Sequence, residues 1–112
     1  MTKVVFETEE LENMIRIEAL LQALGYVPIP VVSDQGQLEA WVRHVMTTRR
    51  KLSGWEMELV AVLVFEGLDL EGARAKLEWG EGTARSIWMG LARTLDVTSV
   101  DELRELVGGL TA

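Results

Sequence analysis

Seven consecutive apolar residues, 59–65, constrain the fold more than any other feature of this sequence. A helix that is apolar on every side has to be buried, so this run predicts the central helix of a helical half. The run is far shorter than the roughly 20 apolar residues that a membrane-spanning helix requires. Ser53 and Glu56 precede it with the spacing of a capping box, and Gly67 follows it as a stop signal. The sequence therefore predicts a helix that begins just after Ser53 and ends at Glu66.

The residues after this central helix carry the signals of further helices. Asp69 is typical of a helix cap, and Ser99 with Glu102 makes a second capping box. The predicted elements are a helix over residues 68–77, a tight corner at 78–80, a helix over 81–95, and a last helix after Ser99. Two short helices joined by a corner of about three or four residues are the plan of a helix-turn-helix motif.

Residues 1–50 predict a β-α-β-α arrangement. Residues 3–7 are typical of a short strand, and the helix that follows them, stopped by Gly25, carries one apolar stripe: Met14, Ile17, Leu21 and Leu24. Two prolines restrict residues 26–32 to an edge strand or an extended segment. A second helix carries the stripe Leu38, Trp41, Val42, Val45 and Met46. We therefore predict an α+β fold, mostly helical, with a small β-α-β-α half at residues 1–50 and a four-helix helix-turn-helix module at 51–112.

Composition excludes several kinds of chemistry. The chain has no Cys, which excludes disulfides and thiolate catalysis and fits the reducing cytoplasm. His44 is the only histidine, so neither a histidine metal cluster nor a Ser-His-Asp triad can form. Trp55 and Trp88 fall at core or core-edge positions, where packing explains them, and Trp79 stands at the corner. We expect a cytoplasmic protein without enzymatic activity, cofactor or metal and without membrane association.

The net charge of −7 is unevenly distributed along the chain. Residues 43–54 contain four basic side chains and no acidic one, whereas acids outnumber bases on both sides. Arg49, Arg50 and Lys51 lie at the end of the second predicted helix, where cations are favourable for the helix dipole. The same side chains are candidates for contacts with a phosphate or a protein partner. The sequence leaves both interpretations open.

The second helix of the predicted motif has a surface suited to DNA. Its core stripe consists of Ala84, Trp88, Leu91 and Leu95. The opposite face, which carries no acid, includes Ser86, Met89 and Arg93, with Arg85 on its flank and Thr83 near the start of the same helix. A protein surface that enters the major groove needs small or polar groups near base edges and cations near phosphates. We therefore predict these five residues as DNA contacts.

Several short segments of the second half occur in a fixed order and spacing: Leu52-Ser53-x-x-Glu56, Glu66-Gly67-Leu68, Glu81-Gly82-Thr83-Ala84-Arg85, Leu91-Ala92-Arg93-Thr94-Leu95-Asp96-Val97-Thr98-Ser99, and Glu102-Leu103. Over residues 52–107 they resemble the C-terminal DNA-binding domain of the LuxR/NarL regulators. The resemblance implies that the helix of residues 83–95 enters the major groove, with Arg85 at a basic position, and that the closing helix serves dimerisation. The sequence departs from the family where Gly80 replaces a serine cap and Asp96 replaces a glycine.

The first half carries another set of landmarks: Val4-Val5-Phe6 before acidic residues, Leu20-Leu21-x-x-Leu24-Gly25-Tyr26, and Asp34-x-Gly36. Over residues 1–42 they resemble the opening of a response-regulator receiver. No third strand follows to carry a phosphate-accepting aspartate, so Glu7, Glu9 and Glu10 would form an acidic pocket without an acceptor. An unrelated β-α-β-α unit is the alternative.

These observations predict a DNA-binding transcriptional regulator that acts as a homodimer. Operator half-sites pair with two-fold protein symmetry, and a single helix with two arginines would bind weakly alone. We expect the N-terminal half to supply the dimer contact. The alternative function is an acidic protein-interaction module that binds a transcription regulator or RNA polymerase in place of DNA.

Overall fold

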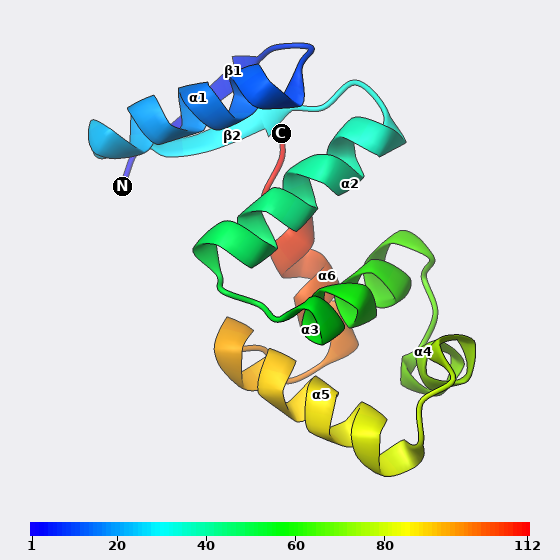
Figure 1. The fold of residues 1–112 in the computed structure, drawn as a ribbon. Helices are drawn as coiled ribbons and strands as arrows, with labels where there is room; N and C mark the ends of the chain where they lie inside the picture. The colour runs from blue at the N-terminus through cyan, green and yellow to red at the C-terminus, as the bar shows by residue number, and fades with distance from the viewer. The chain divides into compact units, whose positions relative to one another are not determined.

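The computed structural model describes residues 1–112 and confirms an α+β fold that is mostly helical. The chain forms two compact units (Figure 1). The first contains residues 1–42 together with 108–112, and the second contains residues 43–107. None of the helices combines the length and the apolar character needed to span a membrane.

A two-stranded parallel sheet organises the first unit. Strand β1 (Lys3–Glu7) pairs with β2 (Val27–Val31), with Lys3 opposite Val27 and Glu7 opposite Val31. Parallel strands need a crossover connection, and helix α1 (Leu11–Ala23) provides it. The helix lies along the two strands in Figure 1. Helix α2 (Gln35–His44) follows β2, so the predicted β-α-β-α order is confirmed.

The prolines of β2 lie on the side of the strand that faces away from β1. The Val27 N–H donates to the Thr2 carbonyl at 2.9 Å, so the residues that alternate with Val27 direct their backbone groups outward. Pro28 and Pro30 occupy these outward positions, and their missing N–H groups therefore cost no bond to β1. The Pro30 carbonyl instead accepts a hydrogen bond from the Ala112 N–H at 2.9 Å. The outer edge of β2 is thus covered by the end of the chain.

The C-terminal residues belong to the first unit through two contacts. Besides the Ala112 bond, the Trp41 indole Nε1 donates to the Leu110 carbonyl at 2.9 Å. Trp41 is buried and meets the ring of Phe6 edge-on, with centroids 6.4 Å apart. No local pattern in the sequence indicated this return of the chain.

The apolar stripe predicted for α1 is wrong at its C-terminal end. Met14 is fully buried, but Leu24 is 62% exposed, as is Leu20. The helix ends at Ala23, and Leu24 is its C-cap, just before Gly25 with a φ of 86°. The stripe therefore loses its last residue because the helix ends before it. Glu18, only 5% exposed, faces inward at a position between Met14 and Leu21.

The second unit is entirely helical. Beyond α2 it contains η1 (Val45–Arg49), α3 (Gly54–Val60), η2 (Ala61–Phe65), α4 (Leu70–Leu77), α5 (Glu81–Leu95) and α6 (Val100–Gly108), where η marks π-helical turns. The capping box at the start of α3 is confirmed, because the Glu56 N–H donates to Ser53 Oγ and the Ser53 N–H donates to Glu56 Oε1. At the start of α6, Ser99 caps as predicted, but Glu102 accepts from Thr98 rather than from Ser99.

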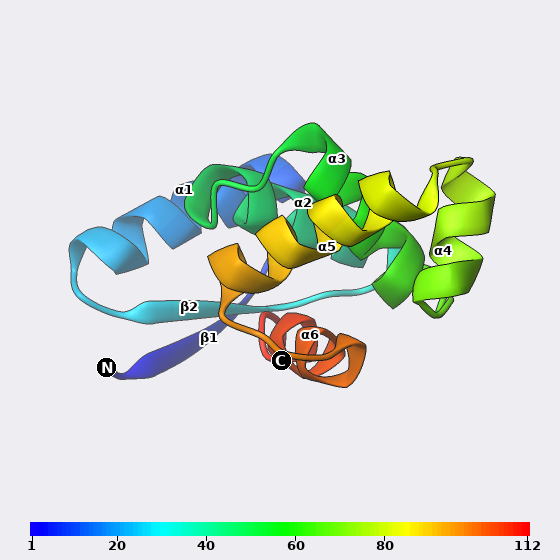
Figure 2. The same ribbon diagram turned by 90° about the horizontal axis from the view of Figure 1, so that it is seen from below.

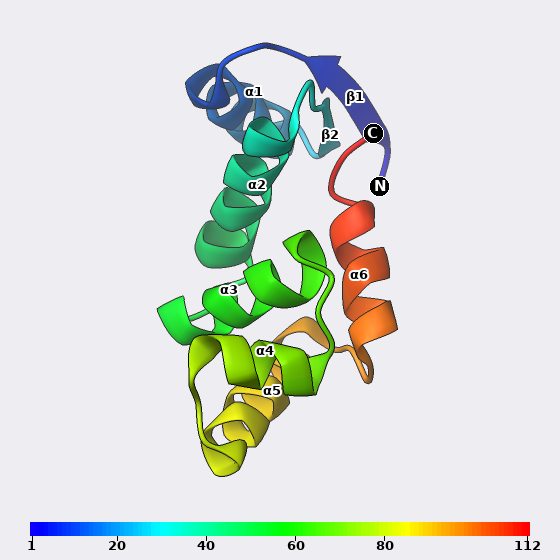
Figure 3. The ribbon, with the colours of Figure 1, turned by 90° about the vertical axis from the view of Figure 1, so that its right-hand side faces the viewer.

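The continuous helix formed by α3 and η2 is the buried centre of this unit. Leu59, Val60 and Leu63 are at most 2% exposed. Gly67 ends the helix with a φ of 69°, a conformation that favours glycine. Helix α6 runs beside this central helix (Figure 3), and Arg104 donates from there to the carbonyls of Leu63 and Leu68 at 3.1 and 3.2 Å. Arg104 therefore satisfies the Leu63 carbonyl in the last turn of the central helix and the Leu68 carbonyl in the loop that follows it.

Candidate nucleic-acid interface

Helices α4 and α5 form the predicted pair of short helices, and they cross at a steep angle in Figure 2. Asp69 caps α4, since its carboxylate accepts from the Gly72 N–H at 2.7 Å. Arg74 fixes the corner between the helices by donating to the Trp79 carbonyl at 3.0 Å while it pairs with Glu71 at 2.6 Å. The corner is thus held by a charged pair from α4.

The corner contains a backbone conformation that the sequence did not signal. Glu78 is the C-cap of α4 and has a φ of 57°, in the left-handed region. Asp96 adopts the same conformation after α5, with a φ of 54°, at the position where the LuxR/NarL pattern has a glycine. Non-glycine residues in this region cost roughly 1–2 kcal/mol each.

We expect Glu78→Gly to raise the free energy of unfolding by about 1 kcal/mol, because glycine adopts the left-handed conformation without a steric penalty. Glu78→Gln is the matched control, since it removes the charge and keeps the side chain that causes the strain. Urea denaturation of the three proteins measures the difference. Equal stabilisation by both substitutions would assign the effect to charge and contradict this explanation.

Helix α5 packs on α3 through a position without a side chain. Leu91 and Leu95 of α5 are both buried. A Cβ atom on Gly90 would lie 3.2 Å from Glu56 Oε2, so the absence of a side chain lets the capping carboxylate of α3 approach α5 closely. This contact fixes which side of α5 faces the unit and which side faces solvent.

The five residues predicted as DNA contacts all lie on the solvent side of α5. Thr83, Ser86, Met89 and Arg93 follow one another at helical steps of three and four residues, and Arg85 lies one turn before Met89. All five are exposed, and Met89 is 53% exposed. We call these five residues the α5 strip.

The two arginines of the α5 strip have no ion pair and no hydrogen bond within the protein. Three other cations of the second unit are engaged within the protein: Arg74 with Glu71, Lys76 with Glu66, and Arg104 with Asp101 and two carbonyls. Arg85 and Arg93 are therefore available for an external anion without first breaking an internal contact.

The three basic residues at the end of η1, Arg49, Arg50 and Lys51, differ in their exposure to solvent. Arg49 is half-buried and has interactions within the protein. Arg50 and Lys51 are exposed, and Lys51 has a φ of 61°. Only these last two side chains are presented to solvent as candidate phosphate or partner contacts.

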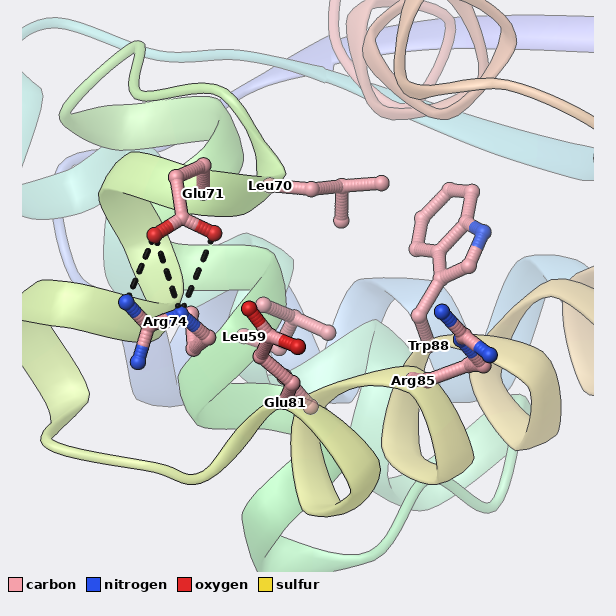
Figure 4. A pocket seen from close by; sticks show the side chains of 8 residues that line it. Leu59, Leu70, Glu71, Arg74, Glu81, Arg85 and Trp88 are labelled. Carbon is pink, nitrogen blue, oxygen red and sulfur yellow. Dashed lines mark hydrogen bonds and ion pairs between the residues drawn. The ribbon is translucent and has the colours of Figure 1, made fainter.

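A pocket of about 380 Å³ lies between α4 and α5, beside the α5 strip (Figure 4). Leu59, Leu70 and Trp88 give it an apolar lining, and Glu71, Arg74, Glu81 and Arg85 add charged groups. The hydrogen bond from Arg74 lowers the pKa of Glu71, which therefore stays ionised at neutral pH. Two carboxylates and two guanidinium groups thus line the pocket, so the charges of its ionised side chains balance.

The prediction that Trp55 packs in the core is wrong. Its side chain is 62% exposed and meets the ring of Trp79 edge-on, with centroids 6.2 Å apart. Trp55 lies in the first turn of α3, directly after the capping residue, where the side chain points away from the centre of the unit. The corner tryptophan is thus one half of an aromatic pair on the surface.

The acids of the first unit do not form an ion-binding cluster. Glu7, Glu9 and Glu10 are all exposed. No group of three or more acidic or histidine side chains in the structure is arranged to hold a metal ion. The sheet contains β1 and β2 alone, without the third strand that carries the phosphate acceptor in a receiver.

Incubation with a small-molecule phosphodonor should therefore leave the intact mass of the protein unchanged. The physical reason is that these exposed carboxylates are not arranged to hold the metal ion that neutralises an incoming phosphoryl group. Mass spectrometry of the intact protein checks this directly. A labile phosphoryl adduct that maps to one acidic residue would contradict the prediction.

Comparisons of the chain with protein-family models, with curated proteins and with solved structures found no match.

Proposed function

We propose that this protein is a cytoplasmic DNA-binding regulator of transcription that places α5 in the major groove. The observation that carries the proposal is the α5 strip, five exposed residues of which none is acidic and whose Arg85 and Arg93 have no partner within the protein. Ser86 and Thr83 supply small polar groups for base edges, and Met89 supplies an apolar contact. The net charge of −7 resides on other surfaces of the molecule.

Arg85 and Arg93 alone would make only a small electrostatic contribution to DNA binding. Each phosphate contact adds about −0.9 to the slope of log K against log salt, so one copy should show a slope of about −2 and a dimer about −4. Exposed Arg50 and Lys51 would increase this slope if they also reach the backbone. The proposal therefore requires a dimer to reach the affinity of a specific regulator.

Fluorescence anisotropy with labelled genomic fragments at low salt tests the proposal. We expect binding that weakens with salt at a slope between about −2 and −4, and a subset of fragments that resists competition by random DNA. Failure of the wild-type protein to bind any fragment at about 50 mM salt would refute DNA binding.

One observation favours a protein partner as the second candidate. Exposed Trp55 pairs with half-buried Trp79 at the surface, and this pair and the apolar lining of the pocket are features that an apolar segment of another protein would fit. This partner would be a transcription regulator or RNA polymerase. Trp55→Ser should then abolish co-sedimentation with purified RNA polymerase, whereas Arg93→Ala should leave it unchanged.

A further inference from the structure

Strand β1 has a free edge along its whole length, at the margin of the first unit (Figure 3). Thr2 directs its carbonyl toward β2, so Lys3, Val5 and Glu7 direct their backbone groups the opposite way. None of these N–H groups has a hydrogen-bond partner within the protein. A free edge with both donors and acceptors is a template for pairing with another strand.

The two edges of the sheet differ in this respect. At the outer edge of β2, the prolines remove the donors, and the Ala112 N–H already occupies the Pro30 carbonyl. Neither device protects β1, and Val5 at its centre is 60% exposed. Strand addition is therefore possible at β1 and blocked at β2.

The positions of the charged residues along β1 indicate which strand would pair with it. When two copies run antiparallel with Val5 opposite Val5, Lys3 of each copy lies opposite the partner's Glu7. Each of these three residue pairs exchanges two backbone hydrogen bonds, so every outward N–H and C=O group is satisfied. Opposite charges that face each other across strands stabilise the pairing, and parallel in-register pairing would place like charges together.

We propose that two copies of this chain associate through antiparallel pairing of their β1 strands, which forms a four-stranded sheet in the order β2–β1–β1–β2. The interface is isologous and closes on itself, so it yields a dimer and no larger polymer. The proposal specifies the dimer contact on which the proposed function depends, but it does not require DNA to be the partner.

Sedimentation velocity of the full chain tests the pairing. We expect the wild type to dimerise below about 100 µM. Val5→Pro should give a monomer, because proline removes the central outward donor while leaving the bonds to β2 intact, as Pro28 and Pro30 do on the other strand. Val5→Thr keeps the donor and is the matched control; circular dichroism verifies that both variants are folded.

A charge exchange tests the register without depending on proline. Lys3→Glu and Glu7→Lys each place like charges opposite one another twice per dimer, and each should weaken self-association by about tenfold. An equimolar mixture of the two variants restores both opposite-charge pairs and should regain wild-type association.

A monomeric wild type at about 100 µM, a Val5→Pro variant that dimerises normally, or a mixture no tighter than its components would each overturn the proposal. Loss of the dimer together with retained low-salt DNA binding would support β1 pairing and leave the DNA interface standing. Loss of DNA binding in a protein that still dimerises would refute only the function.

Discussion

Replacing Arg85 and Arg93 together by alanine is expected to weaken DNA binding by about 100-fold and to reduce the salt slope by about one unit for each arginine in contact with a phosphate. Both side chains are exposed on α5 and have no internal partner, so the folded structure loses nothing when they are removed. Each lost hydrogen bond to a charged group corresponds to roughly tenfold in affinity. Anisotropy titrations at several salt concentrations measure both quantities.

Arg16→Ala is the matched control for this experiment. Arg16 is exposed on α1, where it pairs with Glu12 at 2.9 Å, and its removal changes the net charge by the same amount as the single substitution Arg93→Ala, half the change made by the double replacement. We expect its DNA affinity and salt slope to remain near those of the wild type. If Arg16→Ala weakens binding as strongly as Arg93→Ala, the effect follows total charge and α5 is not the interface.

Replacing Arg104 by alanine is expected to lower the free energy of unfolding by about 1–3 kcal/mol. Its guanidinium donates to the Leu63 and Leu68 carbonyls, and Leu63 is completely buried. Water cannot easily replace the lost donor at this position, so a carbonyl at the end of the central helix would be left unsatisfied. Urea denaturation followed by circular dichroism measures the loss.

Asp101→Ala distinguishes the carbonyl contacts of Arg104 from its ion pair. The carboxylate of Asp101 is 3.7 Å from Arg104 and its side chain is 90% exposed, so the pair contributes little. We expect the free energy of unfolding of this variant to lie within about 0.5 kcal/mol of the wild-type value. A loss as large as that of Arg104→Ala would show that the ion pair is the stabilising contact.

The helices could be predicted from the sequence because their ends are marked by local signals. The capping residues Ser53, Asp69 and Ser99 hydrogen-bond to backbone groups within the next turn, so residue spacing alone identifies them. Gly67 marks a stop for an equally local reason. The α5 strip was predictable in the same way, since helical periodicity decides which residues share a face.

Features that depend on distant residues or on unusual backbone could not be predicted. The bond between Ala112 and Pro30 joins residues far apart in the sequence, and no pattern near either one signals it. Glu78 and Asp96 adopt left-handed conformations that sequence rules assign to glycine. The edge-on contact between Trp55 and Trp79 joins the first turn of α3 to the corner after α4, and no local pattern near either residue signals it.

The contact between Glu56 and Gly90 links two parts of the second unit that are otherwise described separately. One carboxylate oxygen of Glu56 holds the Ser53 N–H, and the other lies against the backbone of α5. The first turn of α3 and the seating of α5 therefore share a single side chain. A substitution at Glu56 would therefore be felt both at the start of the central helix and at the contact with α5.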